Sequence, residues 1–98
     1  MAAYVIAEIS VTDPEVYEKY KAAAPPSVAA FDGAYRVRGG TVTPLEGAAP
    51  TGRVVVLEFP DVATAQAWYG SDAYQAVLPF RLASADCRAF IVDGAPPT

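Results

Sequence analysis

Residues 53–60 form an uninterrupted apolar strand pattern, Arg-Val-Val-Val-Leu-Glu-Phe-Pro, in a chain of only 98 residues. Successive side chains of a strand point to opposite faces, so Val54 and Val56 share one face of this strand. Val55 and Leu57 share the other face, which is equally apolar. A single small domain can cover only one of the two. We therefore expect the second face to pack against another copy of the chain, in a sheet-to-sheet homodimer.

The length and composition indicate one folded domain. With 53% hydrophobic and 18% charged residues, the chain is too apolar to be disordered. Its longest apolar runs fall short of the roughly 20 residues that a membrane span needs, so we expect no membrane partner. We expect a single domain over residues 1–94 and a tail over 95–98. The first residues lack the charged start and apolar stretch of a secretory signal, which predicts a cytoplasmic location.

Charge and residue usage argue against several classes of function. The net charge is −4 and the seven Lys and Arg residues are scattered, which is unlike a nucleic-acid-binding protein. Histidine is absent, and with it the commonest metal ligand, the usual haem ligand and the usual general base. We expect no metal site and no bound cofactor. The single cysteine, Cys87, excludes an internal disulfide, and we interpret it as a small buried hydrophobe, with a reactive thiol as the alternative.

Strand and helix patterns alternate along the chain. β-branched and aromatic residues predict four strands, over Tyr4–Val11, Ala34–Arg38, Arg53–Phe59 and Cys87–Asp93. Helical spacing of apolar residues follows the first and third strands. This order predicts an α+β fold of the ferredoxin-like βαββαβ type, with an antiparallel sheet in which the first and third strands are central.

Capping residues mark where the helices should begin. The run Thr12-Asp13-Pro14-Glu15 combines capping-box spacing with a proline at the first helical position. Asp61 and Ser71 are suited to cap a second and a shorter third helix. Because proline lacks a backbone N–H, we expect Pro25-Pro26 to break or kink the first helix.

A pair of glycines interrupts the second strand. Gly39-Gly40 indicates a bulge, or a place where the backbone closely approaches a ligand or partner. We expect Thr41–Leu45 to continue the strand beyond it, and residues 46–52 to form the loop that leads into the third strand.

Together with the Tyr4 strand, these motifs make the chain resemble the family of the domain of unknown function 1330, in the dimeric α/β-barrel superfamily. The resemblance covers nearly the whole sequence, and its remaining motifs are Arg38-Gly39-Gly40, Leu45-Glu46-Gly47, Leu57-Glu58-Phe59-Pro60, Ala67-Trp68-Tyr69, Ser71, Tyr74-Gln75 and Arg81. It implies the dimeric barrel fold and no agreed activity, so no catalytic residues carry over. Relatives elsewhere in the superfamily look like cofactor-free monooxygenases, isomerases of small lactones or haem-degrading enzymes, and the missing histidine speaks against the last.

Two groups of residues could carry chemistry. Alternation along the strands gathers charged residues on the face away from the helices: Glu8, Glu58, Arg36, Arg38 and Arg88. Opposite charges on neighbouring strands favour a network of ion pairs inside the dimer. We interpret this network as fixing strand register more than as binding a ligand.

The second group is aromatic. It consists of Tyr17, Tyr20, Trp68, Tyr69 and Tyr74, followed by Phe80 and Arg81. Aromatic residues at helical spacing usually belong to a core, but a cleft lined by aromatic rings, hydroxyls and a guanidinium would also hold a small planar acid or phenol. In that case Arg38 or Arg81 would stabilise an anion, a tyrosine or Trp68 would orient the ligand, and Glu58 would accept a proton.

The sequence leaves open whether the protein is an enzyme. The leading interpretation is a small-molecule-binding protein or a cofactor-independent enzyme, monooxygenase-like or isomerase-like, that acts on a small aromatic or acidic compound. The alternative is a structural or interaction homodimer without catalytic activity. That alternative predicts that Trp68, Tyr69 and Phe80 fill the cleft.

Overall fold

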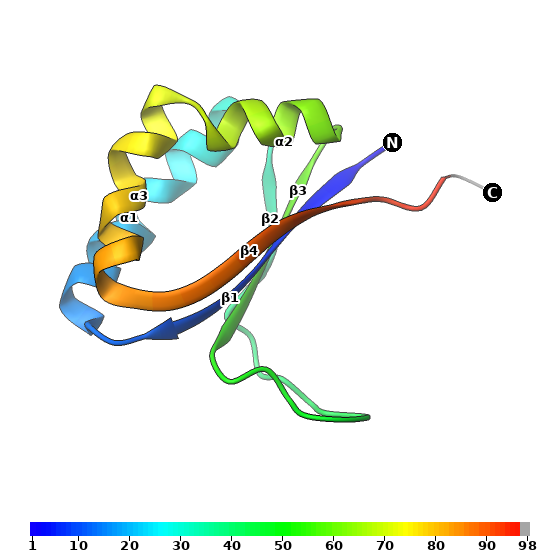
Figure 1. Cartoon of the computed structure of the whole chain (residues 1–98). Coiled ribbons are helices and arrows are strands. Elements are labelled where there is room, and N and C mark those ends of the chain that lie inside the picture. Colours follow the sequence, from blue (N-terminus) through cyan, green and yellow to red (C-terminus); the bar gives the residue numbers. More distant parts are fainter. Residues whose placement is uncertain (97–98) are drawn as a thin grey trace.

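The computed structural model describes residues 1–96, so positions 97–98 of the expected tail lie outside the described residues. Within this range the elements are β1 (Ala3–Val11), α1 (Pro14–Ala30), β2 (Ala34–Arg38), β3 (Arg53–Phe59), α2 (Val62–Tyr69), α3 (Asp72–Ser84) and β4 (Ala85–Asp93). The sheet has the order β2-β3-β1-β4 with antiparallel pairing throughout. The helices lie on one of its faces (Figure 1). The predicted α+β ferredoxin-like fold is confirmed, with β1 and β3 central.

Side-chain caps start the helices at the predicted positions. The Asp13 carboxylate accepts a hydrogen bond from the backbone N–H of Val16 at 3.3 Å, directly before Pro14. Asp61 accepts from the N–H of Thr64 at 2.7 Å, and hydrogen bonding by Thr64, first through its side chain and then through this N–H, holds the pKa of Asp61 below its ordinary value. Each cap satisfies an N–H that the first helical turn leaves without a partner, so the helix boundaries follow from local sequence.

Of the break or kink expected at Pro25-Pro26, the break does not occur, and α1 continues through both prolines to Ala30. Pro25 has no N–H to donate to the carbonyl of Lys21, four residues earlier. That carbonyl instead accepts a hydrogen bond from Nη2 of Arg38, at 2.9 Å. The last turn of α1 also buries Val28 in the core, and this packing favours a continuous helix.

The second strand corrects two predictions. It ends at Arg38, and residues 39–52 form an exposed loop that projects away from the body of the protein, so the expected strand over Thr41–Leu45 is wrong (Figure 1). The sheet irregularity lies between Tyr35 and Val37 instead of at the glycines. This irregularity adds one residue to β2 relative to β3 and so reverses the face on which the following side chains lie. Arg38 therefore lies on the helix-facing side, and the prediction that it lies on the opposite face is also wrong.

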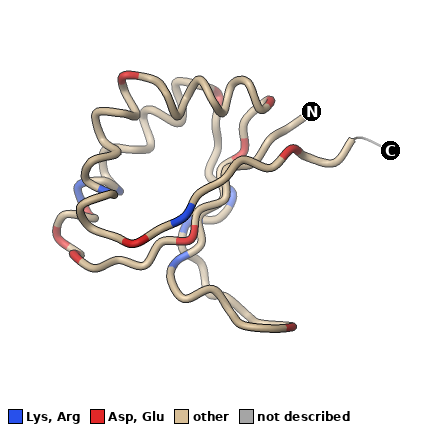
Figure 2. The backbone as a smooth tube through the Cα atoms, viewed as in Figure 1, with Lys and Arg blue, Asp and Glu red and all other residues tan. Residues whose placement is uncertain are grey.

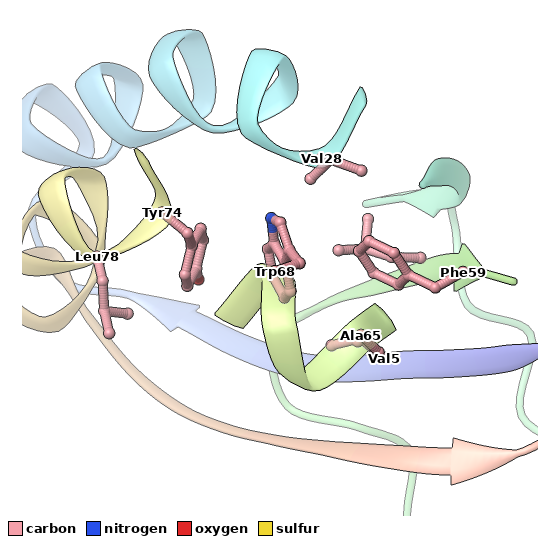
Figure 3. Packing of buried hydrophobic residues seen from close by; sticks show 8 residues of the cluster. Val5, Val28, Phe59, Ala65, Trp68, Tyr74 and Leu78 are labelled. Carbon is pink, nitrogen blue, oxygen red and sulfur yellow. The ribbon is translucent and has the colours of Figure 1, made fainter. Parts of the chain in front are cut away.

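The core lies between the helices and β1 and β3, as Figure 3 shows. Its buried residues are Val5, Val28, Leu57, Phe59, Ala65, Trp68, Tyr74 and Leu78. The Trp68 ring lies 5.2 Å from the ring of Phe59 and 4.1 Å from the ring of Tyr74, measured between centroids. Its indole N–H donates to the Ser27 hydroxyl at 3.2 Å, so the one polar atom of this large side chain is satisfied.

The opposite face of the sheet has no helix over it. Its central positions hold Ile6, Val54 and Val56, and its β4 edge holds Phe90 and Val92, both 42% exposed. The strand that is apolar on both faces thus has one face buried by this chain and one left accessible. Acidic and basic residues are interspersed along the chain in Figure 2. Within residues 1–96, no helix combines the length and apolarity that crossing a membrane requires.

Candidate functional site

A small cavity lies between the helices and the helix-facing side of the sheet. We call it the inner cavity, and its volume is about 40 Å³. Its lining includes all seven residues predicted to bind a ligand: Tyr17, Tyr20, Arg38, Trp68, Tyr69, Tyr74 and Arg81. The structure therefore brings together residues from α1, β2, α2 and α3 that lie far apart in the sequence.

Three guanidinium groups reach the inner cavity from three different elements. Arg38 comes from β2, Arg53 from β3 and Arg81 from α3. Each stands over a tyrosine ring, as measured from Cζ to the ring centroid: Arg38 over Tyr35 at 4.8 Å, Arg53 over Tyr17 at 5.5 Å and Arg81 over Tyr20 at 5.9 Å. The negative faces of these rings attract the cations and help to orient them.

Backbone features position the two strand arginines. Arg38 donates to the carbonyl of Lys21 that Pro25 leaves without its helical donor. Arg53 donates to the carbonyl of Arg38 at 3.3 Å and lies against Gly39, where a side-chain Cβ would come within 2.6 Å of its Cζ. Gly39 also has a φ of +76°, which favours glycine. The close approach at Gly39 is therefore to a side chain of the same chain, whereas the sequence had indicated a bulge, a ligand or a partner at the glycine pair.

Arg81 is the most deeply placed of the three, with only 5% of the residue exposed. Burial lowers the pKa of its guanidinium. Neighbouring phenol groups, of which Tyr74 has the largest effect, raise this pKa, and the net result lies above the ordinary value. Arg81 is therefore charged at neutral pH. Its buried Nε has no hydrogen-bond acceptor within the described chain, and the same is true of Nε of Arg53.

None of the described residues that line the inner cavity is an Asp or a Glu. Buried polar groups in proteins nearly always find a partner, and a buried cation is costly without one. The inner cavity thus combines three guanidinium groups, the ammonium group of Lys21, apolar walls and two unsatisfied N–H donors. This combination is suited to an anion that carries oxygen acceptors.

The tyrosines supply hydroxyl donors. The phenol oxygens of Tyr20 and Tyr74 lie 2.9 Å apart and link α1 to α3. Burial raises the pKa of both residues and of Tyr17, and it raises the pKa of Tyr35 to about 12. These phenols remain protonated at neutral pH, so they can donate hydrogen bonds to a ligand but cannot accept a proton from it.

Glu58, the predicted proton acceptor, lies elsewhere. It sits on the open face of the sheet, where its carboxylate pairs with Nε of Arg36 at 3.1 Å. Glu8 pairs with Nη2 of Arg88 on the same face, at 2.6 Å. Two of the predicted cross-strand ion pairs thus form, and the sheet separates both carboxylates from the inner cavity.

Among the polar and aromatic lining residues, sequence reasoning missed three: Lys21, Tyr35 and Arg53. Arg53 could have been found from the pattern, because it alternates in phase with Val55 and Leu57 on the helix-facing side of β3. Phe80, which was expected to help fill the cleft, is 37% exposed and does not line the cavity. Trp68 and Tyr69 border the cavity without filling it.

Solved structures with the same fold share little sequence with this chain. A protein of unknown function from Rhodopseudomonas palustris superposes with a TM-score of 0.77 at 16% identity, covering 98% of this chain and 84% of that one. A dimeric ferredoxin-like protein of unknown function from Thermobifida fusca gives 0.66 at 20% identity, covering 95% and 91%. SnoaB, a cofactor-independent oxygenase from Streptomyces nogalater, gives 0.61 at 11% identity, covering 98% and 95%. These similarities establish the fold.

Sequence comparison identifies the family. No curated protein matches the chain. The family model described as "Domain of unknown function (DUF1330)" matches residues 2–95, a range that includes every residue lining the inner cavity. Because the match spans nearly the whole chain, the protein belongs to the DUF1330 family, as its sequence motifs indicated.

Proposed function

We propose that this protein binds a small organic anion whose oxygen-acid group, such as a carboxylate, phenolate or enolate, lies in the inner cavity. The observation that carries the proposal is the pair of buried Nε donors, on Arg53 and Arg81, in a cavity whose described lining contains no carboxylate. An oxygen anion would satisfy both donors and balance part of the positive charge. A hydrogen bond to a charged group typically contributes about 1.5–3 kcal/mol.

The walls of the inner cavity favour an aromatic ligand. Trp68, Tyr69 and Tyr74 form a contiguous cluster, with the ring of Tyr69 5.5 Å from that of Tyr74 and 6.2 Å from that of Trp68. Aromatic rings pack well against planar apolar groups, and the few polar groups of a site fix the orientation of its ligand. An acid attached to an unsaturated ring system matches both the walls and the guanidinium groups.

A matched pair of probes tests this function. Benzoate and benzamide have nearly the same size, but only benzoate carries a negative charge. Trp68 is the single tryptophan and lines the inner cavity, so its fluorescence reports binding directly. We expect benzoate to change this fluorescence in a saturable manner and to bind at least about tenfold more tightly than benzamide. Equal affinities, or no binding of either probe in calorimetry, would contradict the proposal.

A second candidate function is cofactor-independent oxygenation of a bound enolate or phenolate. Guanidinium groups and protonated phenols stabilise an oxygen anion, and so they favour the electron-rich form of a substrate that reacts with dioxygen. An isomerase instead needs a group that accepts and returns a proton, and no carboxylate lines the cavity among residues 1–96. The same fold in SnoaB, a cofactor-independent oxygenase, supports oxygenation over isomerisation.

Oxygen uptake separates an oxygenase from a binding protein. A 1,3-diketone or a hydroquinone ionises without a strong base, so it suits a cavity that stabilises anions. We expect the wild-type protein to accelerate oxygen consumption by such a compound, and the Arg53→Gln variant to lose this acceleration. If benzoate binds but no ionisable substrate consumes oxygen faster than in buffer, the oxygenase candidate fails and the binding function stands.

We also propose that the open face of the sheet forms a homodimer. Ile6, Val54 and Val56 form an apolar strip on this face, and the Thermobifida fusca protein of the same fold is described as dimeric. Val56→Asp would place a carboxylate in the middle of the interface. We expect light scattering to show a dimer of the 10.3 kDa chain for the wild type and a monomer for this variant. A wild-type monomer at micromolar concentration would contradict the proposal, whereas a dimer without any ligand would favour the purely structural role.

A further inference from the structure

A second, larger cavity adjoins the inner cavity along β4. We call it the outer groove, and its volume is about 460 Å³. Both cavities are bordered by the same five residues, which are Val5, Trp68, Tyr69, Arg81 and Ala89. The rest of the outer groove is lined by Leu82, Cys87, Phe90 and Ile91. The two spaces therefore meet at Arg81, where the buried guanidinium ends and an apolar surface begins.

The volumes of the inner cavity and the outer groove indicate which part of a ligand each could hold. A cavity of about 40 Å³ holds a few heavy atoms, enough for a carboxylate group or a few waters but not for a whole aromatic ring. The outer groove lies within the range of about 300–1,000 Å³ that is typical of small-molecule sites. A ligand whose acidic group occupies the inner cavity must therefore extend beyond it, and the outer groove is the adjoining space.

Exposed apolar side chains mark the same region. Leu82 is 63% exposed and Tyr69 is 43% exposed, although both border the groove. Ala89 faces the helix side of β4 and is nevertheless exposed, because the helices leave this part of the edge strand uncovered. Apolar surface that continues directly from a binding cavity favours burial of an apolar group of the same ligand.

We propose that the inner cavity and the outer groove are two compartments of one site, and that the ligand is an amphiphilic acid. Its acidic group binds Arg53 and Arg81, and its apolar body, larger than a single six-membered ring, lies in the outer groove against Leu82 and Ile91. This inference rests on the proposed anion-binding function and adds the class of ligand. Tyr69, which borders both compartments, packs against the junction between the acid and the apolar body.

A series of fused-ring acids measures the contribution of the outer groove. Benzoate, 2-naphthoate and 2-anthroate carry the same carboxylate and differ in the number of rings. We expect the dissociation constant, from Trp68 fluorescence or calorimetry, to fall roughly tenfold or more from benzoate to 2-naphthoate, because the second ring enters apolar surroundings. We expect a further decrease for 2-anthroate.

A charge placed in the outer groove tests where the added rings bind. Leu82→Glu introduces a carboxylate at an exposed position, so the fold should tolerate it. We expect this variant to reduce the ratio of naphthoate to benzoate affinity to about one. The matched control is Leu45→Glu, in the loop over residues 39–52, where Leu45 is 94% exposed and lines neither cavity. This control should leave the affinity ratio unchanged.

The thiol of Cys87 gives a second, independent readout. It is half-buried, lines the outer groove and does not line the inner cavity, and it is the only cysteine in the chain. Alkylation by N-ethylmaleimide, followed by mass spectrometry, therefore reports on this compartment alone. We expect saturating 2-naphthoate to slow alkylation severalfold, and saturating benzoate to have a smaller effect.

The outcomes separate this inference from the function on which it rests. If none of the three acids binds, the anion-binding function itself is wrong. If benzoate binds and the larger acids bind no more tightly, the function stands and the two-compartment site is wrong. A ring-dependent gain that survives Leu82→Glu, with Cys87 unprotected, would also overturn the inference, because the rings would then lie outside the outer groove.

Discussion

The two faces of the sheet hold arginine in opposite circumstances. On the open face, Arg36 and Arg88 each pair with a carboxylate, Glu58 and Glu8 respectively. On the helix-facing side, the inner cavity contains arginines but, among the described lining residues, no carboxylate. The comparison teaches that the same residue type is neutralised within the chain on one face, whereas on the other face it lines the cavity in which we propose that an anion binds. The register of each strand decides between them.

The arginines of the two faces also differ in how deeply they are buried. The arginine side chains of the open-face pairs are 57% and 74% exposed, so solvent screens these pairs and each contributes at most about 1 kcal/mol to stability. Arg81 is nearly inaccessible, so water cannot replace the missing acceptor of its Nε. A ligand that supplies this acceptor should therefore stabilise the folded protein more than a salt bridge on the open face does.

Neighbouring residues of β3 give the largest expected contrast between the faces. Leu57→Ala removes a core side chain and should lower the free energy of unfolding by about 2–5 kcal/mol at any protein concentration. Val56→Ala acts on the open face, so its cost should depend on protein concentration, since dilution releases the dimer partner. Urea unfolding at two protein concentrations checks this. An equally large, concentration-independent loss for Val56→Ala would mean that the open face is already covered within one chain.

The proline in α1 offers a contrast between stability and binding. Pro25→Ala restores an N–H that competes with Arg38 for the carbonyl of Lys21. We expect the free energy of unfolding to rise by up to about 3 kcal/mol, and the affinity for benzoate to fall severalfold as Arg38 loses its anchor.

Pro26→Ala is the matched control for this prediction. It restores an N–H directed at the carbonyl of Ala22, which within residues 1–96 accepts no hydrogen bond from a side chain of the inner cavity. Stability should rise while affinity stays the same, as measured by unfolding and by Trp68 fluorescence on the same samples. Equal affinities for both proline variants would show that the Lys21 carbonyl does not position Arg38.

Arginine substitutions on the two faces compare the two roles directly. Arg53→Gln removes a charged donor from the inner cavity and should weaken benzoate binding at least about tenfold. Arg36→Gln removes a charge from the open face and should leave that affinity unchanged. Isothermal titration calorimetry of both variants checks this, and a similar loss for both would mean that general electrostatic attraction, and not the cavity, binds the anion.

Alkaline pH should lower the free energy of unfolding through the tyrosines on the helix-facing side of the sheet. The effect should be smallest near neutral pH. Burial raises the pKa of Tyr20 and Tyr74, and that of Tyr35 to about 12, above the ordinary value near 10 of the unfolded chain. Folding thus keeps these phenols protonated where the unfolded chain ionises them, so their contribution is complete below about pH 10 and is lost as pH rises further.

Unfolding measurements at pH 8, 10 and 11 test this dependence, and Tyr20→Phe should make the decline shallower. Benzoate affinity should be constant between about pH 6 and 9, because neither these tyrosines nor benzoate titrates there. A step in affinity near pH 7 would point to another titrating group in the site.

Much of the fold could be predicted because its rules are local. Period-two alternation located β3 to the residue and β2 at its start, although β2 was expected to continue beyond Arg38, and the caps at Asp13 and Asp61 set the starts of two helices. The same signals, with the motifs of the DUF1330 family, were sufficient for the order of the sheet. For the candidate site, seven residues that line one cavity could be named but not their arrangement, since that depends on how three helices pack over the sheet.

What the sequence determined by itself was which residues form strands, where helices begin and that one strand is apolar on both faces, because these depend on neighbours a few positions away. Only the tertiary structure decided the placement of Arg38, Arg53 and Glu58. A single extra residue between Tyr35 and Val37 turned Arg38 toward the helices, and packing carried α1 through Pro25 so that the freed carbonyl could hold it. Such outcomes depend on contacts between distant segments, and those contacts exist only once the sheet and its helices have assembled.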